Sequence, residues 1–191
     1  MNGLNNEQKI VKLLFKDFFS FYNSRIISKV IGISHAGAFK LLKNMTKKEL
    51  VIPVRVGQAT IYSLNQENPI VLRAVEMALT IEAQEYKRWQ EEFDELKNYV
   101  KFAILFGSIL KNEKSAKDID LLIVADKNNF SKIKKIVQDR NNLLNRKVHL
   151  LLQNISDFEN DVRIKKKTML EIISNGIVLF GQQEIVKNLT K

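Results

Sequence analysis

The chain has 191 residues, 45% of them hydrophobic and 27% charged, a composition typical of a globular protein with one large domain or two small ones. It contains no cysteine, which excludes disulfides and thiolate metal sites, and no apolar run reaches the ~18–20 residues of a membrane-spanning helix. The polar start MNGLNNEQK does not match a secretory signal, so we expect a cytoplasmic protein with no membrane partner.

The net charge of +10 is unevenly distributed along the chain. Residues 1–66 carry +7, residues 67–100 carry −4 and residues 101–191 carry +7. These shifts predict two basic domains, 1–66 and 101–191, joined by an acidic connector, 67–100. Basic charge favours polyanionic partners such as nucleic acid or nucleotides. A lysine-rich solvated surface is an equally good explanation of the charge taken alone.

The first third of the chain predicts three helices and a hairpin. Apolar spacing indicates a helix that begins after Asn5 or Asn6, and a second that begins near residues 23–24 and ends at Gly32. A third helix begins at Ser34, after the short turn GIS. Two β-type runs, LVIPVRV and TIYSLN, then flank GQA as a hairpin.

This order resembles the winged helix-turn-helix domains of bacterial and archaeal transcription regulators, over about residues 5–65. Glu49 stands where that family usually has glycine, so a different turn into the first wing strand is expected. The resemblance implies that the third helix enters the major groove of double-stranded DNA. A protein-contact role for the same domain is the alternative. The DNA-binding residues that it implies are Ser34, His35, Gly37, Lys40, Lys43, Asn44, Arg55 and Gln58.

Residues 67–100 predict one long connecting helix. It begins at Asn68-Pro69 and contains no further Gly or Pro. Its apolar residues follow a 3-4-3-4 spacing that is typical of a coiled-coil seam: Tyr86, Trp89, Phe93, Leu96 and Val100. We expect this stripe to hold a homodimer. Packing of the stripe on the next domain is the alternative.

From residue 101 onward, strand and helix patterns alternate. Strands are expected at 101–106, 118–124, 147–153 and 177–181. Helices are expected at 128–144 and at 156–174, the latter capped by Ser156. The pattern predicts a small α/β domain with one sheet, and the whole chain is therefore expected to be a two-domain protein of mixed α+β and α/β class.

Asp118 and Asp120 lie two residues apart in the second of these strands, so both side chains project from the same face. Two neighbouring carboxylates repel each other, and a divalent cation is the simplest partner that makes the arrangement favourable. Oxygen ligands suit Mg²⁺, which takes further ligands from water and phosphates. Gly107-Ser108 follows the first strand, where a short helix would offer donors to a phosphate. These residues predict a site for a metal with a nucleoside triphosphate (NTP).

The second half resembles the minimal nucleotidyltransferase domains of the DNA polymerase β-type superfamily, over about residues 95–185. The signature is Gly-Ser followed by Asp-X-Asp, here with nine residues between Ser108 and Asp118. The resemblance implies that Asp118 and Asp120 bind Mg²⁺ and are catalytic, and that Gly107, Ser108 and Lys111 contact the phosphates of an NTP. Aspartates that merely cap strand ends are the alternative.

One residue departs from the pattern of the active members, which carry a third carboxylate on the next strand. This chain has His149 there, and a neutral imidazole is a poor Mg²⁺ ligand, although it is able to act as a general base. Three functions stay open. The first is a DNA-binding regulator with a catalytically degenerate nucleotide-binding domain, and the second is an active Mg²⁺-dependent nucleotidyltransferase that acts on a hydroxyl of a small molecule, protein or RNA. The third is a toxin-neutralising partner.

Overall fold

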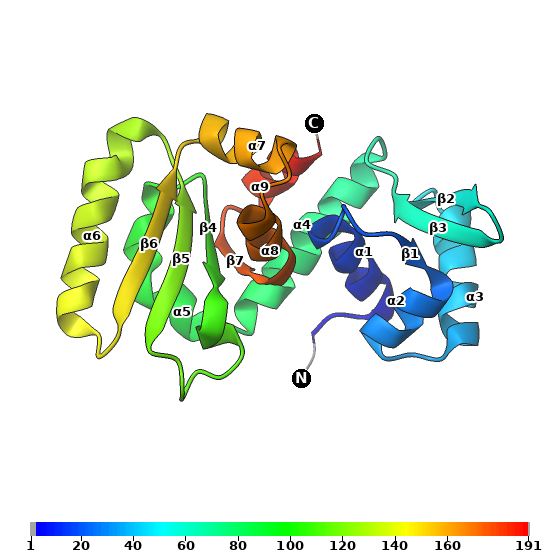
Figure 1. The fold of residues 1–191 in the computed structure, drawn as a ribbon, viewed down its shortest axis with the longest axis horizontal. Coiled ribbons are helices and arrows are strands. Elements are labelled where there is room, and N and C mark those ends of the chain that lie inside the picture. The colour runs from blue at the N-terminus through cyan, green and yellow to red at the C-terminus, as the bar shows by residue number, and fades with distance from the viewer. Residues whose placement is uncertain (1–2, 191) are drawn as a thin grey trace. The chain divides into compact units, whose positions relative to one another are not determined.

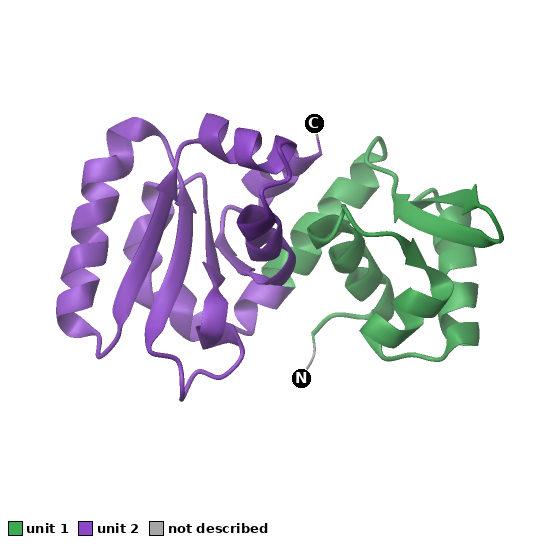
Figure 2. Ribbon diagram, viewed as in Figure 1, with its two compact units in different colours: residues 1–81 green, residues 82–191 purple. Residues whose placement is uncertain are grey.

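The structure, a computed structural model, describes residues 3–190. The chain divides into two compact units, residues 1–81 and residues 82–191 (Figure 2). The expected connector, 67–100, is thus shared between the two units, and each unit is described by itself. Among the described residues, no helix combines the length and apolarity that a membrane crossing requires.

The first three helices of unit 1 begin where the sequence signals predict, and the second also ends at the expected glycine. α1 (Asn6–Lys16) has Asn5 as N-cap, whose side chain accepts from the Gln8 backbone while the Gln8 side chain accepts from the Asn5 backbone. α2 (Ser24–Ile31) is capped by Asn23 and ends at Gly32, which has a φ of 75°. α3 (His35–Lys47) is capped by Ser34.

A small antiparallel sheet completes unit 1 (Figure 1). β2 (Val51–Val56) and β3 (Ala59–Leu64) form the expected hairpin, and the short β1 (Tyr22–Asn23), which the sequence did not reveal, pairs with the other side of β3. Its core takes buried side chains from the helices and the sheet: Ile10, Ile27, Leu42, Met45 and Val51. The helix–strand–helix–helix–hairpin order is the winged helix-turn-helix plan, and the expectation for this part of the chain is confirmed.

The turn before β2 keeps a left-handed backbone without glycine. Glu49 has a φ of 56°, a region that side chains with a Cβ rarely adopt. Its carbonyl oxygen accepts hydrogen bonds from the side-chain amides of Asn65, at 3.0 Å, and Asn68, at 3.1 Å. These two amides therefore help to hold the left-handed residue in place, and the different turn expected from the missing glycine stays a prediction.

The prediction of a single long helix over residues 67–100 is wrong. α4 (Pro69–Gln84) ends before a turn at residues 85–86, and α5 (Lys87–Glu92) and the 3₁₀ helix η1 (Asp94–Asn98) follow. Trp89, Phe93 and Leu96 are buried in the core of unit 2, with Tyr86 and Val100 packed against it. The apolar stripe therefore packs within the chain, as the alternative held, and it is not available as a dimer seam. A homodimer stays a prediction without this support.

Unit 2 is built on a four-stranded sheet in the order β6-β5-β4-β7 (Figure 1). β4 (Phe102–Phe106) pairs antiparallel with both β5 (Asp118–Val124) and β7 (Ile177–Phe180). β5 pairs parallel with β6 (Lys147–Gln153). A parallel pair needs a long crossover, and α6 (Phe130–Leu143) provides it. The 3₁₀ helices η2 (Gly107–Leu110) and η3 (Lys127–Asn129) follow β4 and β5.

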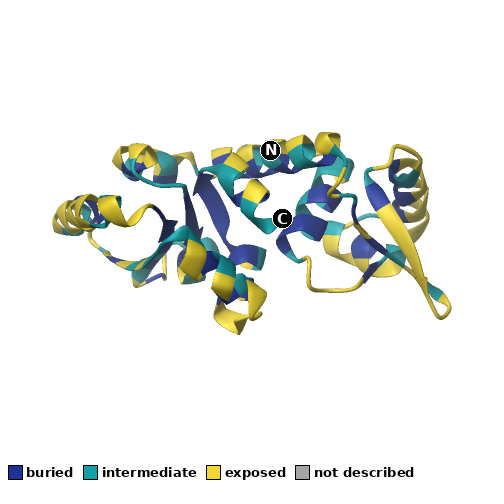
Figure 3. Ribbon diagram, turned by 90° about the horizontal axis from the view of Figure 1, so that it is seen from above, coloured by how far each residue is buried: buried dark blue, intermediate teal, exposed yellow. Residues whose placement is uncertain are grey.

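The helix expected at 156–174 is two helices. α7 (Ile155–Arg163) is capped by Asn154 rather than Ser156, and α8 (Lys167–Asn175) follows a break at Lys165, which has a φ of 53°. α9 (Gln182–Leu189) follows β7 and was not predicted. Residues of β4, β5 and β7 are mostly buried, whereas β6 is mostly exposed or half-buried. Figure 3 shows exposed residues along α6 and along the β2–β3 hairpin. The mixed two-domain fold class is confirmed.

Candidate functional site

Asp118 and Asp120 lie at the beginning of β5 and project from one face of the sheet. The residues between and after them, Ile119 and Leu121, are buried on the opposite face in the core of unit 2. The two aspartate side chains keep 32% and 24% of their surface exposed. The strand therefore presents both carboxylates to solvent while its other face anchors them.

His149 completes a three-residue cluster with the two carboxylates. In the parallel register of β5 and β6 it is the partner of Asp120, although 28 residues separate the two in sequence. Its Nδ1 lies 3.4 Å from Oδ2 of Asp118 and 3.5 Å from Oδ1 of Asp120. One donor atom from each of the three residues lies within 4.8 Å of the others. The imidazole thus occupies the third position of a possible metal site.

The electrostatics of the cluster favour a bound cation. Burial raises the pKa of the Asp120 carboxyl above its ordinary value, and the charge of Asp118 raises this pKa further, while His149 opposes the shift. The ionised carboxylates therefore repel each other in the free protein. A cation between them would remove that repulsion.

Gly107 leaves the space in which the Asp120 carboxylate lies. It follows β4, where Phe106 is the register partner of Asp120, and its φ is 83°. A Cβ at this position would lie 2.0 Å from Oδ2 of Asp120 and 2.9 Å from its Cγ. Glycine is thus needed for the left-handed backbone and for the space that the carboxylate occupies.

Ser108 and Lys111 are exposed beside this glycine. The backbone oxygen of Ser108 accepts from the backbone N–H of Lys111, at 3.0 Å, and of Asn112, at 3.1 Å. The element that begins here is η2, a single 3₁₀ turn of four residues. The predicted phosphate donors at this point are therefore a hydroxyl, an ammonium and individual backbone N–H groups, without the dipole of a long helix.

The donors fit Mg²⁺ only in part. Carboxylate oxygens are the ligands that Mg²⁺ prefers, and Asp118 and Asp120 supply them from a rigid strand. An imidazole nitrogen is not a typical Mg²⁺ ligand, yet the third candidate donor is His149, whose Nδ1 lies near both carboxylates. The sequence predicts Asp118 and Asp120 as metal ligands and His149 as a possible general base, and the strand register shows that the three side chains lie together.

The predicted DNA-binding residues of α3 are all exposed. Ser34 uses its hydroxyl to cap the helix, accepting from the Gly37 N–H at 3.1 Å, and Nε2 of His35 lies 3.0 Å from the hydroxyl of Ser24. Lys40 and Lys43 lie on the side of α3 that faces away from its buried residues. The two lysines are therefore placed to contact a polyanion.

The wing of the hairpin supplies Arg55 and Gln58, both exposed. Arg55 donates from Nε to the carbonyl oxygen of Gly57 at 3.3 Å, and Gln58 lies in the turn between β2 and β3. The structure places these residues and the α3 lysines in the same compact unit.

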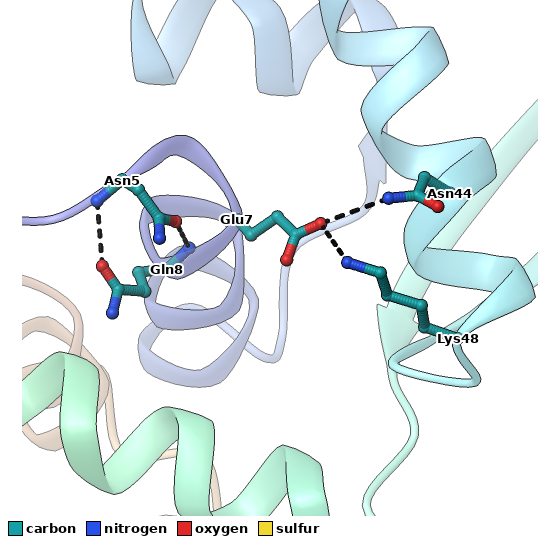
Figure 4. A network of polar contacts seen from close by, with 5 residues as sticks. All are labelled: Asn5, Glu7, Gln8, Asn44 and Lys48. Carbon is teal, nitrogen blue, oxygen red and sulfur yellow. Dashed lines mark hydrogen bonds and ion pairs between the residues drawn. The ribbon is translucent and has the colours of Figure 1, made fainter.

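Two further residues, which were not predicted from the sequence, lie beside the exposed lysines of α3. Lys47, seven residues after Lys40 and so on the same side of α3, lines a groove of about 820 Å³ with Lys40 and Lys43. Glu7 of α1 also lines this groove, and its Oε1 lies 2.9 Å from Nζ of Lys48 and 3.5 Å from Nδ2 of Asn44 (Figure 4). The i+7 spacing was a usable signal for Lys47, whereas nothing local indicated Glu7.

A family model described as polymerase beta, nucleotidyltransferase matches residues 90–185, just over half of the chain. No curated protein matches the sequence.

Three solved structures resemble parts of the chain. The adhesin competence repressor AdcR from Streptococcus pyogenes has a TM-score of 0.38 at 14% identity, over 48% of this chain and 66% of its own. MepR, a transcription regulator of the Staphylococcus aureus multidrug efflux pump MepA, has 0.38 at 17% identity, over 49% and 72%. Lactococcus lactis ZitR in complex with DNA has 0.32 at 21% identity, over 50% and 61%. Because these scores are below 0.5, the winged-helix assignment rests on the topology of unit 1 itself.

Proposed function

This chain belongs to the polymerase beta nucleotidyltransferase family, and from that premise we propose that it is a DNA-binding regulator whose unit 2 binds an NTP together with a divalent cation. The observation that supports nucleotide binding by unit 2 is the pair of carboxylates on β5 beside Gly107 and Ser108. A repelling pair on a rigid strand, with a glycine that makes room for one member, supports a cation site rather than two strand caps.

The roles of the residues follow from their chemistry. Asp118 and Asp120 hold the cation, which also binds the triphosphate. The Ser108 hydroxyl and the Lys111 ammonium, both exposed next to Gly107, donate to phosphate oxygens. A bound metal–triphosphate supplies charge neutralisation at the phosphates.

We also propose that this unit releases little or no pyrophosphate. Transfer would require an activated hydroxyl and a further anionic metal ligand, and in active members of the family a third carboxylate serves this need. Here the neighbouring strand carries His149 at that position. The two aspartates suffice to hold a cation that the triphosphate already chelates, so binding is retained while transfer is lost.

The proposal that unit 1 binds DNA rests on the exposed lysines of α3 and on the +7 charge of residues 1–66. Lys40, Lys43 and Lys47 lie along one side of the helix that enters the major groove in helix-turn-helix proteins. Phosphate contacts of this kind fix the helix on the duplex, and the other exposed residues of α3 and the wing then contact bases.

The test is calorimetry with Mg²⁺ and a non-hydrolysable NTP, beside an assay for pyrophosphate release with an NTP. The parent should bind, and Asp118→Asn should bind at least roughly tenfold more weakly because it removes one anionic ligand. Asp126→Asn is the matched control, since Asp126 is an exposed aspartate just beyond the other end of β5 and pairs with Lys101. This control should bind like the parent.

The parent should show no sustained pyrophosphate release, and His149→Asp should gain release if the rest of the site is intact. Equal nucleotide binding by the parent and Asp118→Asn would refute the site. Robust turnover by the parent that Asp118→Asn abolishes would instead establish an active nucleotidyltransferase, and loss of this turnover in His149→Ala would then support His149 as its general base.

A further inference from the structure

We propose that Asp118, Asp120 and His149 form a metal site that selects a divalent ion accepting imidazole, with Zn²⁺ as the preferred ion, over Mg²⁺. This inference rests on the cation half of the proposed function and is independent of nucleotide or DNA binding. It replaces the family's expected ion because the third donor of this chain is nitrogen.

Two of the three separations between the donor atoms are closer to those around a tetrahedral ion than to those around an octahedral one. With metal–donor bonds of about 2.1 Å, the donors of a tetrahedral Zn²⁺ site lie about 3.4 Å apart. The donors of an octahedral Mg²⁺ site with similar bonds lie about 3.0 Å apart. Nδ1 of His149 lies 3.4 Å from Oδ2 of Asp118 and 3.5 Å from Oδ1 of Asp120, closer to the tetrahedral value than to the octahedral one. The separation of the two carboxylate oxygens is within 4.8 Å, and rotation of the partly exposed carboxylates closes it.

The chemistry of the donors points in the same direction. Zn²⁺ readily accepts a mixed set of imidazole nitrogen and carboxylate oxygen, whereas Mg²⁺ keeps oxygen ligands and several waters. Three protein donors leave a fourth tetrahedral position open, as in zinc sites that also bind water or a substrate oxygen. In this chain a phosphate oxygen of a nucleotide has the chemistry to fill that position.

The three donors are fixed by regular structure. Asp120 and His149 are register partners on adjacent parallel strands, and Val148, next to His149, is buried in the core of unit 2. Gly107 leaves the space in which the Asp120 carboxylate lies. Donors placed by strands in this way are held more closely than donors on loops, which favours one geometry over others.

Few neighbouring groups compete with a metal ion for the two aspartates or offer Zn²⁺ an alternative site. Lys147 shares the face of β6 with His149 and is the register partner of Asp118, yet within residues 3–190 the structure records no ion pair between Lys147 and either aspartate. The chain has no cysteine, and its second histidine, His35, belongs to unit 1. Specific Zn²⁺ binding by this protein should therefore depend on His149.

The experiment uses the full chain without a histidine tag. Zn²⁺ binding is measured by calorimetry, and Co²⁺ is used as a spectroscopic substitute whose visible absorption becomes intense in tetrahedral sites. The parent should bind one Zn²⁺ per chain, give an intense Co²⁺ spectrum, and retain Zn²⁺ in a hundredfold excess of Mg²⁺. His149→Ala should lose the Co²⁺ spectrum and weaken Zn²⁺ binding by at least roughly tenfold, because loss of an outer-shell partner of a ligand already costs roughly 10–100-fold.

Two further variants test the assignment. His35→Ala, the matched histidine control, should bind Zn²⁺ like the parent. His149→Asp should bind Mg²⁺ more tightly and show a smaller preference for Zn²⁺, because it restores an all-oxygen set. His149 keeps 61% of its side chain exposed, so these changes at position 149 should leave the fold intact.

Unchanged Zn²⁺ affinity in His149→Ala, or displacement of Zn²⁺ by a hundredfold excess of Mg²⁺, would overturn the inference. The result is separable from the proposed function. A parent that binds Zn²⁺ through His149 but binds no NTP with either metal would refute the nucleotide half and leave the metal site established. A parent that binds Mg²⁺–NTP but not Zn²⁺ would refute the Zn²⁺ site and support nucleotide binding by unit 2.

Discussion

Gly107→Ala should disable the cation site without removing any of its ligands. The new Cβ would lie 2.0 Å from Oδ2 of Asp120, far inside the contact distance of two such atoms, and 3.2 Å from the Asp120 Cβ. The Asp120 side chain keeps 24% of its surface exposed, so it can turn toward solvent and relieve the overlap. The variant should therefore fold, but with one carboxylate moved away from Asp118 and His149.

The expected magnitudes follow from these contacts. A non-glycine residue at a φ of 83° costs about 1–2 kcal/mol of the free energy of unfolding. Displacement of one of three donors should weaken cation binding by roughly 10–100-fold. The control is Gly32→Ala, because Gly32 has a φ of 75° but nothing within 4 Å of the position of a new Cβ. This control carries a similar backbone strain and no contact with a metal ligand.

Cation affinity is measured by calorimetry, and the free energy of unfolding by urea denaturation followed by circular dichroism. Both variants should lose stability by similar amounts, whereas only Gly107→Ala should lose cation affinity. If Gly107→Ala binds the cation as tightly as the parent, the reasoning that ties Gly107 to Asp120 is refuted. An equal loss of cation affinity in Gly32→Ala would refute it as well, because the effect would then be a general loss of stability.

Two further predictions concern unit 1. The double change Lys40→Ala, Lys43→Ala should weaken binding to double-stranded DNA and reduce the slope of log affinity against log salt by about 2, since each phosphate contact contributes about 0.9. Fluorescence anisotropy across a salt series measures this, with Lys134→Ala on the exposed side of α6 as control, and an unchanged slope would exclude α3 as the DNA-contacting helix. Glu49→Gly should raise the free energy of unfolding by about 0.5–1 kcal/mol, because glycine adopts the φ of 56° without strain. Urea denaturation tests it, and a destabilised variant would show that Glu49 is not strained.

Local signals in the sequence determined much of this molecule. The caps at Asn5, Asn23 and Ser34 begin the first three helices where the spacing of apolar residues predicts them. Alternation along β5 was enough to put Asp118 and Asp120 on one face, because side chains in any strand alternate. These features depend on residues a few positions apart, and so they are visible without a structure.

Two predictions from local signals were wrong: the residue that caps α7 and the partner of the apolar stripe in the connector. Asn154 caps α7 in place of Ser156, since both residue types cap helices and their sequence context does not separate them. The stripe that contains Trp89 and Phe93 has the spacing of a dimer seam. The spacing of apolar residues on a helix does not show whether a second chain or another part of the same chain covers them. In this chain the sheet of unit 2 covers it.

Tertiary structure alone decided how the site is assembled. The parallel register of β5 and β6 brings His149 to Asp120, and the antiparallel pairing of β4 and β5 brings Gly107 against the same carboxylate. Strand order and register depend on long-range packing and on the closure of the chain between the strands, and no local pattern encodes them. The sequence therefore supplied the chemistry of the donors, while the pairing of the strands determined which donors meet and how far apart they lie.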